Sequence, residues 1–82
     1  MSAELIQLFS NISEHLSCEQ SVELWEQAVG CVRQHHLEMV GERTVCIQHL
    51  KTRSPLTGVS HSSLLCNRLL FFAQIHLHYL AT

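Results

Sequence analysis

The 82-residue sequence contains no aspartate, a single proline and three glycines. It also lacks a glycine-rich phosphate-binding loop, an internal repeat and a low-complexity tract. All its acidic side chains are glutamates, and their spacing places them on the solvated faces of helices. Nucleophilic catalysis by a Cys–His pair needs a base within reach and a cleft that encloses the reacting atoms, which a small helical domain rarely provides. We therefore predict that the protein is not an enzyme.

Charged residues are also scarce, at 15% of the chain, against about 25% in ordinary domains. The formal net charge of −2 argues against direct binding to nucleic acid, which depends on neutralising phosphates. All seven acids lie within the first 42 residues, and four of the five bases follow them. This asymmetry fits two solvated faces that attract each other weakly within the fold, or an acidic patch for a basic partner.

The N-terminus lacks the basic and then apolar order of a signal peptide. We therefore expect an intracellular protein, either cytoplasmic or nuclear. In those compartments the sequon at Asn11 stays unmodified and the four cysteines remain thiols by default. The chain ends two residues after Leu80 with no signal that ends a helix, a pattern typical of an N-terminal domain taken from a longer protein.

Apolar residues make up 46% of the chain, and they are densest at 64–80, LLCNRLLFFAQIHLHYL. Projected at about 100° per residue, this segment is apolar over most of its circumference. A polar strip consists of Ser63, Asn67, Gln74 and His78. A membrane span needs about 20 mostly apolar residues, and polar side chains such as Arg68 and His76 interrupt this run. The pattern predicts a helix at 62–81 that lies outside the membrane and needs cover from more than one direction.

The predicted fold class is all-α, a small bundle within a single domain at 1–82. Apolar spacing predicts three helices, at approximately 3–16, 18–51 and 62–81. Ser17 and Gln20 have the spacing of a capping box, which predicts a tight turn before the second helix. Residues 52–63 hold the only proline and six hydroxyl side chains, and they are predicted to form the one loop.

Gly41 leaves the second helix open to two interpretations. As the residue after a helix end it would divide 18–51 in two and give a bundle of four helices. As an interior glycine it would lie within one long, bent helix. Cys46, Ile47 and Leu50 stay in phase with the apolar positions before Gly41, and this agreement favours the long helix.

Seven histidines and four cysteines raise the question of a metal. The pairs Cys31–His35 and Cys46–His49 each present two ligands on one side of a helix, and together they form a two-Cys, two-His set that zinc accepts. In a continuous helix the two cysteines would be about 22 Å apart, so this alternative requires the chain to reverse near Gly41. We expect no cofactor. A second minor feature is Ser54, which precedes Pro55 and could be phosphorylated as a regulatory site.

The excess of apolar side chains predicts that part of the surface meets another molecule. We expect an interaction module of an intracellular scaffold or complex subunit, which buries a helix face against a partner protein or a second copy of itself. Aromatic and large aliphatic anchors dominate such interfaces. The candidates are Trp25, Leu70, Phe71, Leu77 and Tyr79. A zinc-stabilised helical domain built on Cys31, His35, Cys46 and His49 is the alternative.

Overall fold

Four helices and no strand make up the part of the chain that the computed structural model describes, namely residues 3–53, 56 and 59–81. They are α1 (Ala3–Ser13), α2 (Cys18–Gln34), α3 (Val40–Arg53) and α4 (Ser62–Ala81). The predicted all-α class is confirmed, with four helices in place of the three that the apolar spacing favoured. None of the helices in the described ranges is long and apolar enough to cross a membrane.

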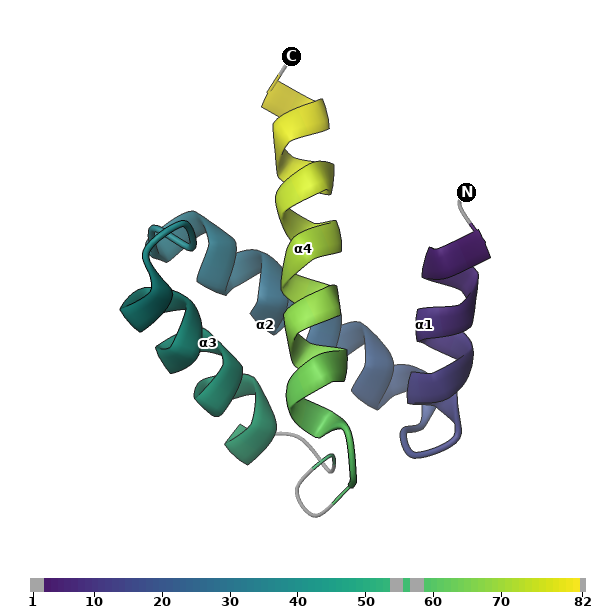
Figure 1. Cartoon of the computed structure of the whole chain (residues 1–82). Coiled ribbons are helices and arrows are strands. Elements are labelled where there is room, and N and C mark those ends of the chain that lie inside the picture. The colour runs from purple at the N-terminus through teal and green to yellow at the C-terminus, as the bar shows by residue number, and fades with distance from the viewer. Residues whose placement is uncertain (1–2, 54–55, 57–58, 82) are drawn as a thin grey trace.

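The last helix stands at the centre of the domain (Figure 1). α2 crosses behind it, α3 lies on one side and α1 on the other, and α4 contacts all three. The C-terminal end of α4 projects beyond the neighbouring helices. The cover that α4 was predicted to need therefore comes from three directions over its first half.

Fifteen buried apolar residues form one continuous core, to which every helix contributes. α1 supplies Leu8 and Ile12, α2 supplies Leu24, Ala28 and Cys31, α3 supplies Cys46 and Leu50, α4 supplies Leu65, Cys66, Leu69, Leu70 and Ala73, and the connections supply Leu16, Leu37 and Leu56. The last core residue along the chain is Ala73. None of residues 74–80 is buried, although four of them are large and apolar.

The turn between α1 and α2 begins earlier than the sequence predicted. α1 ends at Ser13, three residues short of the predicted end, and the backbone N–H groups of His15 and Leu16 both donate to the Ile12 carbonyl at 3.0 Å. The capping box is confirmed: Ser17 Oγ accepts from the Gln20 N–H at 3.2 Å, and Gln20 Oε1 accepts from the Ser17 N–H at 2.9 Å. These bonds satisfy backbone donors that the start of a helix otherwise leaves unpaired.

The long helix predicted at 18–51 is wrong, because the chain breaks at residues 35–39. His35 caps α2 in an extended conformation (φ −126°, ψ 152°), and α3 starts at Val40. The break precedes Gly41, which is the second residue of α3. A helix of 34 residues would be about 50 Å long, whereas the longest dimension of the domain is 32 Å. Reversing the chain instead buries Leu37 and brings Cys46 and Leu50 onto the core.

Three residues of the polar strip of α4, Ser63, Asn67 and Gln74, bind α3, whereas His78 is exposed. The Arg43 guanidinium donates to Asn67 Oδ1 at 2.7 Å, to the Asn67 carbonyl at 3.2 Å and to Gln74 Oε1 at 3.0 Å. One end of the strip is held by Lys51, whose Nζ donates to Ser63 Oγ at 2.9 Å. Polar groups that look like a solvated face in the sequence thus bind one helix to another.

The connection between α3 and α4 is shorter than the predicted loop at 52–63, since α3 continues through Arg53 and α4 starts at Ser62. Within it, Leu56 is fully buried and belongs to the core. Its last residue before α4, His61, has a positive φ of 73°, which non-glycine residues rarely adopt. Ser54, the predicted regulatory residue, lies outside the described residues.

Candidate functional site

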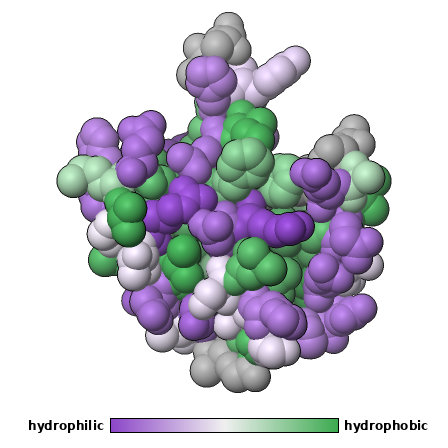
Figure 2. Space-filling model, in the orientation of Figure 1, coloured by the Kyte–Doolittle hydropathy of each residue, from purple (hydrophilic) through white to green (hydrophobic). Residues whose placement is uncertain are grey.

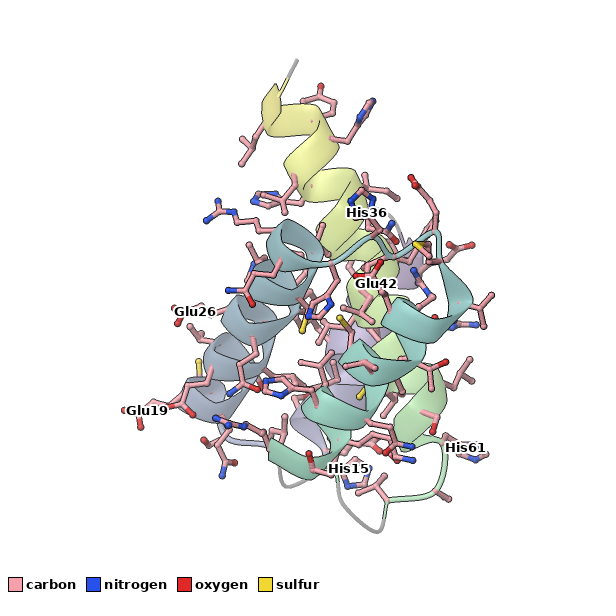
Figure 3. The ribbon with its side chains drawn as sticks, turned by 90° about the vertical axis from the view of Figure 1, so that its left-hand side faces the viewer. His15, Glu19, Glu26, His36, Glu42 and His61 are labelled. Atoms are coloured by element: carbon pink, nitrogen blue, oxygen red, sulfur yellow. The ribbon has the colours of Figure 1, made fainter. Side chains whose placement is uncertain are left out.

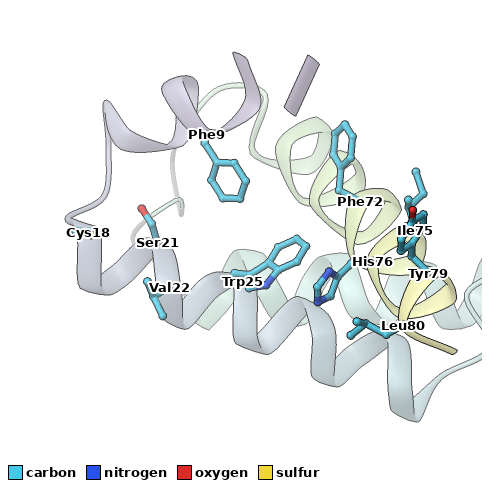
Figure 4. A pocket seen from close by; sticks show the side chains of 10 residues that line it. All are labelled: Phe9, Cys18, Ser21, Val22, Trp25, Phe72, Ile75, His76, Tyr79 and Leu80. Atoms are coloured by element: carbon cyan, nitrogen blue, oxygen red, sulfur yellow. The ribbon is translucent and has the colours of Figure 1, made fainter. Parts of the chain in front are cut away.

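An open apolar groove lies between α1 and the projecting half of α4, with α2 as its floor (Figure 4). Its volume is about 650 Å³. Ten residues line it: Phe9, Cys18, Ser21, Val22, Trp25, Phe72, Ile75, His76, Tyr79 and Leu80. Most of these side chains are apolar. The volume of the groove is within the range of ligand-binding pockets in proteins, about 300–1,000 Å³. We refer to this feature as the apolar groove.

Three rings hold the floor of the apolar groove in place. The Trp25 indole lies between Phe9 of α1, with ring centroids 6.2 Å apart, and His76 of α4, with centroids 5.6 Å apart. The Trp25–His76 pair meets edge to face, at an angle of 65°, which is a favourable arrangement for aromatic rings. The half-buried Trp25 on the floor therefore contacts both sides of the apolar groove. A ligand that enters the groove should change the environment of this indole ring.

The rim of the apolar groove is formed by large side chains that the fold leaves uncovered. Tyr79 is 79% exposed, Leu80 66%, Val22 51% and Ile75 47%. Single exposed apolar residues are common on protein surfaces, but a contiguous patch marks an interaction site. Figure 2 shows apolar side chains reaching the surface along α4 as well, between hydrophilic side chains of the neighbouring helices.

The residues predicted to face a partner do not all lie together. Trp25 and Tyr79 line the apolar groove. Phe71 is half exposed outside it, with its ring against Phe72 at a centroid distance of 5.6 Å. Leu77 points to a second cavity, on the side of α4 near His35 and His36. The prediction that Leu70 faces a partner is wrong, because Leu70 is fully buried in the core. It lies on a side of α4 that the other helices cover.

Sequence reasoning missed several residues of the apolar groove, notably Phe9, Val22 and Ile75. Phe9 and Val22 share the apolar arcs of their helices with true core residues, so periodicity alone does not separate groove residues from core residues. That separation depends on how the helices cross one another. The sequence did contain one signal, the high density of apolar residues in the last helix. Its apolar run continues past Ala73, where the core ends, so the residues beyond Ala73 remain uncovered.

Acidic side chains border the apolar groove along α2. At about 100° per residue, Glu19, Glu23 and Glu26 fall within about 60° of one another, beyond Val22 on the side away from the core. Arg33 shares this side of α2 but lies about two turns beyond Glu26 along the helix. All three are exposed, and Figure 3 shows Glu19 and Glu26 projecting from the same side of α2. Within the described part of the chain, the only close contact between a carboxylate and a basic side chain joins Glu42 Oε1 to His35 Nδ1 at 3.5 Å. We refer to Glu19, Glu23 and Glu26 as the acidic strip.

The cysteines of the zinc alternative do come together, since the chain reverses between α2 and α3. Cys31 and Cys46 are both buried, and their side chains are close enough to interact. Burial, and after it the neighbouring Cys31 thiol, raises the pKa of the Cys46 thiol to about 12. This raised pKa disfavours the thiolate that a metal requires. His35 contacts Glu42 and His49 is exposed. Across the described ranges, no group of three or more His, Cys or Glu side chains is placed to hold a metal ion.

Comparison with known protein families, with curated proteins and with solved structures finds no match for this chain.

Proposed function

We propose that the domain is a protein–protein interaction module, with a binding rather than a catalytic role. In this proposal the apolar groove receives the apolar face of a helix, from a partner protein or from a second copy of the chain. The observation that carries the proposal is the uncovered half of α4. It presents Ile75, Tyr79 and Leu80 beside Trp25, and none of residues 74–80 is buried.

Aromatic anchors inside an apolar cleft are the usual energetic centre of a protein interface. Trp25 has this character, because it is half-buried at the floor and contacts two other rings. The exposed residues around it would lose their contact with water when a helix covers them, which is the main driving force for association. An intracellular scaffold or complex subunit is the setting that fits a domain whose principal feature is such a surface.

A charged substitution in the apolar groove tests the proposal. Ile75→Glu puts a carboxylate into the groove, and Val45→Glu makes the same type of change at an exposed apolar position of α3. Sedimentation velocity over a wide concentration range measures self-association. Proteins that co-purify with the chain are produced separately, and their binding to each variant is measured directly.

We expect Ile75→Glu to weaken association at least tenfold, as for a central interface residue, and Val45→Glu to leave it unchanged. Equal behaviour of the two variants would reject the groove as the binding surface. So would a wild-type chain that stays monomeric, binds no hydrophobic dye and retains no partner.

A further inference from the structure

We propose that the occupant of the apolar groove is a basic amphipathic helix of another protein, whose lysine or arginine side chains lie along the acidic strip. This inference rests on the proposed function and specifies the partner. An apolar groove alone could bind many kinds of apolar helix face. The negative charge of the acidic strip beside it favours partners with basic side chains next to that face.

The acidic strip is one continuous negative edge. Glu19, Glu23 and Glu26 follow one another at spacings of four and three residues, so their carboxylates are neighbours on the surface of α2 and repel each other. No lysine or arginine precedes Arg33 in the sequence, and the described residues give these three carboxylates no hydrogen bond or ion pair. Positive charge from a ligand would relieve this repulsion as well as add attraction.

The position of the acidic strip matches the geometry of a bound helix. Val22 lines the apolar groove, and on the α2 wheel the strip lies beyond Val22 on the side away from the core. Arg33 is on the same side of α2 but about two turns beyond Glu26, so the edge beside Val22 is negative. A helix is about 10–12 Å wide with its side chains, so one that seats its apolar face on Trp25 and Ile75 places its flanking side chains over this edge. Lysine and arginine stems cover apolar surface while their charged ends reach the carboxylates.

A second copy of the chain fits this edge poorly. Its exposed apolar segment is the end of α4, and residues 69–82 contain no lysine or arginine. Arg43 is bonded to Asn67 and Gln74, and Lys51 to Ser63. The other bases, Arg33, Arg53 and Arg68, belong to three different helices, so no helix of this chain presents a basic face.

The test uses the whole chain and two synthetic helical peptides without tryptophan. Both peptides carry the same leucine face, and one is flanked by lysines while the other is flanked by glutamates. Binding is read from the fluorescence of Trp25, the only tryptophan, at about 50 mM and about 500 mM salt, where screening differs strongly. Circular dichroism verifies that the peptides are equally helical and that each protein variant is folded.

Two variants that change the net charge equally distinguish a specific effect of the acidic strip from a general effect of net charge on peptide binding. Glu19→Gln/Glu26→Gln removes two strip carboxylates. The α1 variant, Glu4→Gln/Glu14→Gln, removes two exposed carboxylates that do not line the apolar groove, one in the first turn of α1 and one just after its end. We expect the lysine peptide to bind wild type at least tenfold more tightly than the glutamate peptide at low salt. The strip variant should lose roughly fivefold in affinity, as two exposed ion pairs allow, and the α1 variant less than twofold.

Equal affinity for the two peptides, or equal losses in the two variants, would overturn the assignment of a basic partner while leaving the groove intact as a binding site. A stable dimer of wild type that Ile75→Glu disrupts would also overturn it, since the occupant would then be a second copy. Failure of both peptides to change Trp25 fluorescence in any variant would reject the proposed function itself.

Discussion

Neighbouring residues on α4 have opposite environments, and Leu70 and Phe71 are the clearest pair. Leu70 is fully buried, whereas Phe71 is 52% exposed. Both were predicted to face a partner, because a helix that is apolar all round gives no internal clue to which side its neighbours cover. The distinction depends on which sides of α4 are covered by the other three helices, and these sides could not be assigned while residues 18–51 were treated as one helix.

Leu70→Ala should destabilise the domain by about 2–5 kcal/mol, because it leaves a cavity in a closed core. Phe71→Ala removes a larger side chain from the surface and should cost less than about 1 kcal/mol. Urea denaturation followed by circular dichroism measures both changes. A larger loss for Phe71→Ala than for Leu70→Ala would contradict the arrangement of α4 described here.

The buried thiol of Cys46 makes stability depend on pH. Its pKa is raised from 9.0 to about 12, chiefly by burial and then by the neighbouring Cys31 thiol. Below pH 9 the thiol is neutral in both the folded and the unfolded chain, so its contribution to stability is fully present. Above pH 9 the unfolded chain releases the proton first, and stability is lost as the pH rises toward 12.

The free energy of unfolding should therefore fall more steeply above pH 9 in wild type than in Cys46→Ala, by up to about 1.4 kcal/mol per pH unit. Cys66, whose pKa burial raises to about 11, is present in both proteins and cancels in the comparison. Urea denaturation at a series of pH values from 8 upward gives the two slopes. Parallel slopes would mean that the Cys46 thiol is accessible to solvent in the folded chain.

At the scale of the helices, local signals predicted starts and apolar faces better than ends. The capping box at Ser17 placed the start of α2 correctly because its signal lies within four residues. The end of α2 depends on where Leu37 and Cys46 are buried, which is a property of the whole fold. The apolar positions of α2 and α3 both face the same core, and their spacing along the sequence happens to continue across Gly41. The apolar periodicity therefore did not reveal the break between the two helices.

The junction of α3 and α4 depends on Arg43, whose guanidinium makes three hydrogen bonds to Asn67 and Gln74. Arg43→Met keeps an extended side chain but removes all three bonds, and it should cost about 1–3 kcal/mol, since the amide groups lose a charged partner. Arg68→Met, at an exposed position of α4, is the control and should change stability by no more than about 0.5 kcal/mol. Thermal or urea unfolding compares the two variants, and equal effects would show that the Arg43 bonds add nothing.

At the scale of the whole molecule, the decisive feature is the mismatch between the length of α4 and the extent of the core. The core ends at Ala73, and the apolar sequence continues through Leu80. The excess was visible in composition, so an uncovered surface could be predicted. The position of the apolar groove and its acidic strip could not, because they depend on how α1 and α2 cross α4.

The most direct test of the central claim is a titration of the isotopically labelled chain with the lysine-flanked peptide, followed by two-dimensional 1H–15N NMR. If the apolar groove is the binding site, the indole N–H of Trp25 and the amides of residues 72–80 will shift, while those of α3 (Val40–Arg53) stay in place. Shifts confined to α3, or no shifts at all, would contradict the account.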